Sequence, residues 1–240
     1  MRAIFKLLLT MLAGTQLATL SLQAATLYQL DNNTPNNIVN ASDGTELLDN
    51  WFGNVFTVSA GANLINRVDF GVFTTSPGSA ASVSLYRVTG AGGNPALGAT
   101  RLYTQPFTPL TGNGTNVFLQ QINLTSPVAF NVGDEFLVSV LIRSVIANPP
   151  NDVYPFVIDN GASSAGSYWA RSGPNLFDLD NLSGAKTIDQ PLSTGGFAPG
   201  PGHTIIRAFG IEVPEPSSIA IAGLGIVALL IVRRNAMNAN

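Results

Sequence analysis

The chain has 240 residues, of which 10% are charged, well below the usual share of about 25%. It contains no cysteine, which excludes a thiol nucleophile and a cysteine-ligated zinc site. The formal charge is −3. Residues 25–212 hold seven basic and 13 acidic residues, a formal charge of −6, which argues against nucleic acid and anionic membrane surfaces as partners.

The first 24 residues read as a secretory signal peptide. Arg2 and Lys6 supply positive charge, an apolar core runs over 7–12 and continues weakly over 17–22, and small residues follow. Cleavage is predicted after Ala24, with Ala25 as the alternative. An uncleaved anchor helix is the competing interpretation, although the apolar core is short for a membrane span.

Residues 25–212 alternate between apolar and polar side chains, as strands do. Val68, Phe70 and Val72 face one way, and the even-numbered residues of 136–142 do the same. Further strands are expected at 26–30, 54–59, 82–88, 99–104, 118–124, 153–159, 166–171 and 203–212. About ten short strands separated by turns predict a single all-β domain, an antiparallel β-sandwich. Leu141→Asp is expected to be milder than Val140→Asp if the face of Leu141 is less buried.

The order of these segments also resembles extracellular jelly-roll modules. The likeness rests on the sequence Val-Ser-Leu-Tyr at 83–86, on Pro127 to Val138 with its Gly-Asp turn, and on Ser-Tyr-Trp at 167–169. It implies a jelly-roll-like sandwich and transfers no functional site.

Four aromatic residues are candidates for stacking on sugar rings: Trp51, Tyr154, Tyr168 and Trp169. Trp51 is followed by Phe52, and Tyr168 by Trp169. Neighbours on a strand point to opposite faces, so one ring of each pair is expected to point inward. Burial of all these rings in a core is the alternative.

Other chemistry is sparse. His203 is the only histidine and is interpreted as a strand-edge residue, with no catalytic residue assigned. Asp178, Asp180 and Asn181 form an oxygen-rich cluster of the kind that binds Ca²⁺, with a solvated loop as the alternative, and no other cofactor is expected. Asp134 and Glu135 are adjacent, so they cannot face each other across a glycosidase cleft.

A second apolar run, Ile219 to Val232, precedes Arg233 and Arg234. Counted from Ser217 it has 16 residues, about 24 Å as a helix, and the arginines can extend it to the headgroups. It predicts a short transmembrane helix over 217–232, with the basic end in the cytoplasm. A buried core helix is the alternative.

Val213, Pro214, Glu215 and Pro216 stand directly before that run. The prolines bias this segment to extended, unpaired backbone, the form that a protease cleft holds. A Pro-Glu-Pro motif, an apolar segment and a basic end in this order resemble the PEP-CTERM domain of Gram-negative bacteria, over residues 213–240. The resemblance implies an exosortase as partner and an inner-membrane-anchored precursor that is passed to the cell surface or matrix. A plain linker to an anchor is the alternative.

Together these features predict an exported, non-enzymatic protein of the cell surface or of a biofilm matrix rich in exopolysaccharide. A carbohydrate-binding module that acts on exopolysaccharide is the second hypothesis. A glycoside hydrolase is the third.

Overall fold

The computed structural model describes residues 25–39, 48–73, 80–110, 117–145, 156–192 and 198–212. These contain strands and two 3-10 helices. The strands are β1 (Thr26–Tyr28), β2 (Pro35–Val39), β3 (Leu48–Thr57), β4 (Leu64–Val72), β5 (Ala81–Val88), β6 (Ala99–Phe107), β7 (Phe118–Ala129), β8 (Glu135–Val145), β9 (Phe156–Asp159), β10 (Ser167–Ser172), β11 (Lys186–Thr187) and β12 (Ile206–Ile211). The helices are η1 (Ala91–Gly93) and η2 (Pro95–Leu97).

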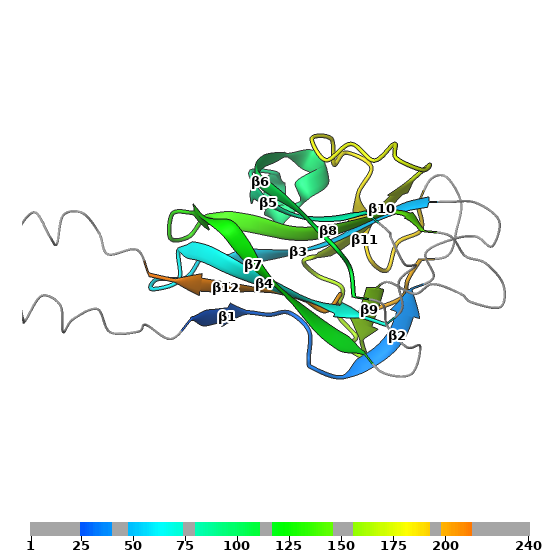
Figure 1. Cartoon of the computed structure of the whole chain (residues 1–240), viewed down its shortest axis with the longest axis horizontal. Helices are drawn as coiled ribbons and strands as arrows, with labels where there is room; N and C mark the ends of the chain where they lie inside the picture. Colours follow the sequence, from blue (N-terminus) through cyan, green and yellow to red (C-terminus); the bar gives the residue numbers. More distant parts are fainter. Residues whose placement is uncertain are drawn as a thin grey trace, which may run out of the picture.

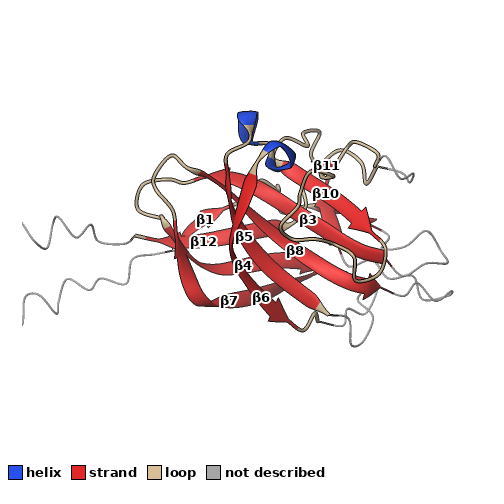
Figure 2. Cartoon of the chain, turned by 90° about the horizontal axis from the view of Figure 1, so that it is seen from above, coloured by secondary structure: helices blue, strands red, loops and turns tan. Residues whose placement is uncertain are grey.

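Two antiparallel sheets pack face to face as a sandwich (Figures 1 and 2). One sheet has the strand order β1-β12-β4-β7, and the other has the order β11-β10-β3-β8-β5-β6. A separate pair, β2 and β9, is also antiparallel. The all-β sandwich predicted from the alternating pattern is therefore confirmed. The sequence pattern missed β2 and the two-residue strand β11.

The core between the sheets is built from the alternating residues. Val68, Phe70 and Val72 of β4 are fully buried, as are Val138 and Val140 of β8. Both strands contribute to one hydrophobic cluster, because every second side chain of a strand points to the same side. The predicted inward faces of these two strands are confirmed.

The six-stranded sheet is buried on its outer side as well. Leu137 and Leu141 of β8 have no exposed surface and belong to a second hydrophobic cluster. Phe177 and Leu179, from the loop between β10 and β11, and Ala96 of η2 pack against this cluster. The condition for a milder effect of Leu141→Asp is therefore not met, because loops cover the Leu141 side as well.

Candidate functional site at the exit pole of the sandwich

Both ends of the domain leave it at the same place. Strands β1 and β12 are antiparallel neighbours, with Thr26 paired to Gly210. The beginning of β1 and the end of β12 therefore lie side by side, at the same end of the sandwich in Figure 1. We call this end the exit pole and define it as Ala25, Glu212 and the segments 58–63 and 130–134.

Hydrogen bonds join the two segments of the exit pole to each other. The backbone N–H of Phe130 donates to the carbonyl of Asn63 at 2.9 Å. The N–H of Gly133 donates to the carbonyl of Val58 at 2.9 Å, and the N–H of Val58 donates to Asp134, also at 2.9 Å. Each segment links a strand of one sheet to a strand of the other, so the bonds tie the sandwich together at this end.

The end of β12 and the neighbouring strand β1 both lie closely against the 58–63 segment. The Tyr28 hydroxyl donates to the carbonyl of Ala62 at 3.0 Å and accepts from the N–H of Ser59 at 3.0 Å. A Cβ on Gly210 would lie 2.2 Å from the Ala62 carbonyl oxygen, so only glycine permits this approach. The chain therefore reaches Glu212 from a rigid base.

The aromatic side chains predicted to stack on sugars are buried. Trp51 and Trp169 have no exposed surface, and Tyr168 is 6% exposed. Trp51 and Tyr168 lie in the outer cluster of the six-stranded sheet, where Trp51 stacks on Phe177 with ring centroids 5.9 Å apart. Trp169 lies in the inner core. The stacking prediction is wrong for these three rings, because protein covers both faces of the sheet; Tyr154 lies outside the described residues.

The predicted metal-binding residues make hydrogen bonds within the protein. Asp178 Oδ1 accepts from the N–H of Asp180 at 2.9 Å, and Asp180 Oδ2 accepts from Arg101 at 2.7 Å. Asn181 Oδ1 accepts from the hydroxyl of Ser183 at 2.7 Å. In the described ranges no three His, Cys, Asp or Glu side chains are grouped to hold a metal ion. These contacts are those of a hydrogen-bonded loop, and a calcium role stays a prediction.

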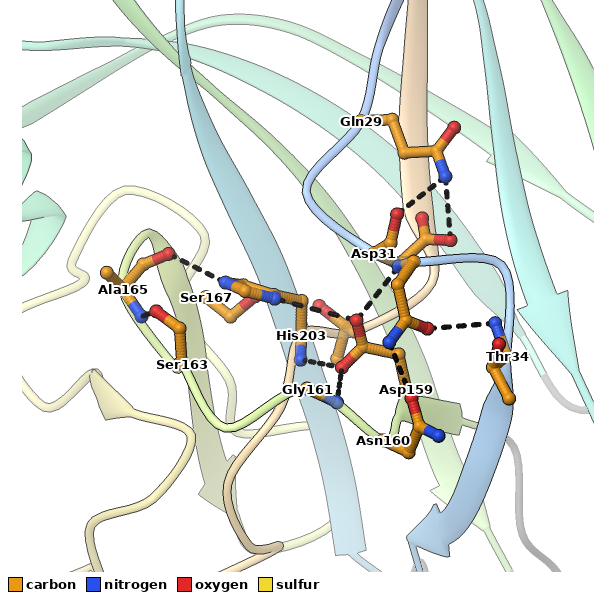
Figure 3. A network of polar contacts seen from close by, with 12 residues as sticks. Gln29, Asp31, Thr34, Asp159, Asn160, Gly161, Ser163, Ala165, Ser167 and His203 are labelled. Atoms are coloured by element: carbon orange, nitrogen blue, oxygen red, sulfur yellow. Dashed lines mark hydrogen bonds and ion pairs between the residues drawn. The ribbon is translucent and has the colours of Figure 1, made fainter.

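His203 belongs to a polar network around the buried carboxylate of Asp159 (Figure 3). Asp159 accepts backbone N–H groups from His203 at 2.7 Å, Asn32 at 2.9 Å and Gly161 at 3.0 Å. The His203 ring directs Nε2 to the carbonyl of Ala165 at 3.2 Å and Nδ1 to Asp159 at 3.6 Å. Three separate chain segments meet at Asp159, which is the arrangement of a structural tie.

The outer side of the four-stranded sheet carries a row of charged and aromatic side chains that the sequence analysis did not select. The Arg67 guanidinium lies 3.5 Å from the centroid of the Phe209 ring and 3.1 Å from Asp69. Burial raises the pKa of Asp69, while Arg67 and Arg207 beside it act in the opposite direction. Arg207 makes a two-point ion pair with the buried Asp31, with N···O distances of 2.6 and 2.9 Å.

We call this surface the open face and define it as the half-buried Arg67 and Phe209 with the exposed Gln121 and Asn123. Asp69 and Arg207, which pair with neighbouring charges, are themselves buried. The signal for it was present in the sequence: Arg67 and Asp69 are the polar positions that alternate with Val68 and Phe70. The alternation showed that they point outward, whereas only the sheet order brought β12 beside β4.

Beyond the exit pole, the residues from 213 onward lie outside the described part of the chain. Comparison with protein families matches residues 212–234 to the PEP-CTERM protein-sorting motif. The chain carries a PEP-CTERM sorting signal. The match includes the predicted motif, Val213 to Pro216, and both arginines, Arg233 and Arg234.

The PEP-CTERM signal implies processing by an exosortase, and proteins that carry it are exported and sorted to the cell surface. It begins one residue after β12 ends. Among the described residues, no helix is long and apolar enough to cross a bilayer. The predicted membrane helix, 217–232, and the predicted signal peptide, 1–24, lie outside those residues.

Two solved structures are similar to this chain. One comprises the cysteine protease and lectin-like domains of Cwp84, a surface-layer-associated protein of Clostridium difficile, with a TM-score of 0.47 and 16% identity. The other is a clostridial Cwp84 after propeptide cleavage, with a TM-score of 0.48 and 16% identity. Each match covers 79% of this chain but only 36% and 40% of the other chain. A sequence search found no matching curated protein.

Proposed function

We propose that this chain is an exported, non-enzymatic protein of the cell surface or exopolysaccharide matrix of a Gram-negative bacterium, which an exosortase releases from the inner membrane. The observation that carries the proposal is the position of the sorting motif, one residue after the last strand of a sandwich. The helix at 217–232 holds the precursor in the membrane, and the signal peptide at 1–24 directs its export.

The exit pole supports this function because it separates the folded domain from the cleavage segment. Pro214 and Pro216 have no N–H to donate, so the segment cannot continue β12 as a regular strand. Gly210 and Tyr28 fix the chain just before the motif. A cut after residue 212 leaves every described strand intact, so the domain is expected to keep its fold when it is released.

A non-enzymatic role is supported by how the buried carboxylates are used. Asp49 has no exposed surface and accepts from Arg143 at 2.7 Å, from the N–H of Asn175 at 3.0 Å and from that of Phe177 at 3.1 Å. Asp31 and Asp159 are likewise occupied by ion pairs or backbone donors. These carboxylates hold loops in place.

We also propose that the sandwich is jelly-roll-like, because the chain crosses between the two sheets from β3 to β4 and again from β4 to β5.

Intact-mass analysis of the protein from its native host tests the proposal. The mature product is expected to begin near Ala25 and to end between Val213 and Pro216. Replacing Pro214 and Pro216 together by Ala allows the downstream helix to extend and is expected to make the anchored precursor accumulate. A mature chain that still reaches Asn240 in cells with an active exosortase would refute the sorting function.

Carbohydrate binding is a second candidate function, and the open face is the observation that favours it. Arg67 stacked on Phe209 offers a planar donor beside an aromatic ring, next to the exposed amides of Gln121 and Asn123. Planar hydrogen-bonding groups beside apolar surface suit the polar edges and apolar faces of sugar rings. The paired charges, Arg67 with Asp69 and Arg207 with Asp31, favour a neutral glycan.

Glycan-array binding of the mature protein tests the second candidate. Arg67→Ala is expected to abolish the signal if the open face binds a glycan. Arg101→Ala is the matched control, since Arg101 is also partly exposed and ion-paired, but on β6 of the other sheet. Equal binding by both variants would refute the assignment of the face.

A glycoside hydrolase needs two carboxylates that face each other across a cleft. Asp134 instead accepts a hydrogen bond from the backbone N–H of Asn131 in its own turn.

A further inference from the structure

The exit pole has an unusual surface for a part of the protein that lies close to a membrane. Its two segments and two end residues include no Lys or Arg, and its charged residues are Asp134 and Glu212. Val132 is 60% exposed at the tip of the turn 130–134. Arg87, which lies beside the pole, is paired with Asp134 at 3.5 Å. Anionic lipid attracts basic clusters, and the pole offers none to such a membrane.

The length of chain beyond β12 limits how far the pole can lie from the bilayer. Five residues, 212–216, separate Ile211 from Ser217, where the predicted membrane helix begins. Fully extended, they span at most about 18 Å, and the two prolines favour an extended form of about 16 Å. The base of this spacer is rigid, because Gly210 and Tyr28 are held by the 58–63 segment. The pole therefore cannot move away from the headgroups by fraying.

We propose that the exit pole is the membrane-facing surface of the anchored precursor, and that the spacer alone holds it there. The partner is the lipid headgroup surface, which the turn tip at Val132 faces without binding it tightly. A single cut in the spacer is then sufficient for complete release, since no second attachment remains. The inference rests on the proposed function in two respects, the anchoring of the chain by residues 217–232 and the removal of residues 1–24.

The opposite end of the domain provides a matched reference position. Leu176 is 73% exposed in the loop after β10, and the neighbouring N–H of Asn175 donates to Asp49 near the start of β3. The end of β3, Thr57, pairs with Glu135 beside the exit pole. The eight residue steps from Asp49 to Thr57 correspond to roughly 26 Å along the strand. Val132 and Leu176 are therefore two exposed apolar residues at different distances from the pole.

The absence of cysteine allows a direct test with the full chain. Val132→Cys and Leu176→Cys variants are each labelled with a fluorophore and inserted into phosphatidylcholine vesicles that carry a headgroup quencher. Several-fold stronger quenching is expected at position 132 than at position 176. Equal or reversed quenching in chains that float with the vesicles overturns the orientation. Chains that do not float with the vesicles refute the anchoring, and with it the proposed function as well as the inference.

A second measurement tests the tether. The mature protein released in its native host is mixed with phosphatidylcholine vesicles and with vesicles that contain anionic lipid. It is expected to bind neither, while the full chain floats with both. Flotation of the mature protein with either kind of vesicle overturns the statement that the spacer alone holds the domain at the membrane.

Discussion

The outer cluster of the six-stranded sheet can be tested by one substitution made at two leucines. Leu141 has no exposed surface and packs in that cluster, whereas Leu176 is 73% exposed. Leu141→Ala and Leu176→Ala remove the same atoms. If the loops around Phe177 and η2 form a real second core, the first substitution destabilises the fold strongly and the second hardly at all.

The expected magnitudes follow from burial. A fully buried Leu→Ala change costs about 2–5 kcal/mol, through lost transfer free energy and the cavity left behind. An exposed change away from special features stays within about 0.5 kcal/mol. For a domain of this size each kcal/mol shifts the melting temperature by about 2–4 °C, so roughly 5–15 °C is expected for Leu141→Ala.

Guanidinium unfolding followed by tryptophan fluorescence measures the difference. Trp51 lies in the same cluster as Leu141 and reports on it directly. A loss of stability below about 1 kcal/mol for Leu141→Ala would show that the loops do not cover the sheet, because replacing a buried leucine in a packed core costs more than that. An equal loss for Leu176→Ala would contradict the assignment in the same way.

Three further predictions concern buried polar groups. Burial raises the pKa of Tyr86 from 10.0 to about 12. Because only the neutral phenol is favoured in the folded state, the free energy of unfolding is expected to fall by up to roughly 3 kcal/mol as pH rises from 10 through 12. Unfolding measured across this pH range is expected to show that Tyr86→Phe removes the loss. Asn54 donates to the carbonyls of Thr204 and Ile206 at 2.8 and 2.9 Å, so Asn54→Asp places carboxylate oxygens against them. The substitution is expected to lower the free energy of unfolding by several kcal/mol, which thermal unfolding measures. Arg207→Lys loses the two-point geometry with Asp31 and is expected to cost about 1–3 kcal/mol in chemical denaturation.

The sequence predicted the fold class because alternation is a local property. The run from Arg67 to Val72 shows which side chains share a face whatever the strand pairs with. The turn residues between the strands act in the same local way. What alternation does not show is whether the second face of a strand meets water. Leu141 and Trp51 therefore appeared to be candidates for exposure until the covering loops were seen.

The ion pairs of the buried carboxylates could not be predicted from the sequence for a related reason. Asp49 and Arg143 are 94 positions apart, and Asp31 and Arg207 are 176 apart. The residues around either carboxylate in the sequence do not indicate which arginine it pairs with. Their roles depend on sheet order and register, which follow from the packing of the whole domain.

The sorting signal was determined by the sequence alone. An exosortase motif acts as a short linear segment, so the order of Val213 to Pro216, the apolar run and Arg233-Arg234 was sufficient to identify it. Only the tertiary structure showed where that signal leaves the domain. Antiparallel pairing of β1 with β12 brings residues 25 and 212 to one pole, because the two strands are adjacent and run in opposite directions.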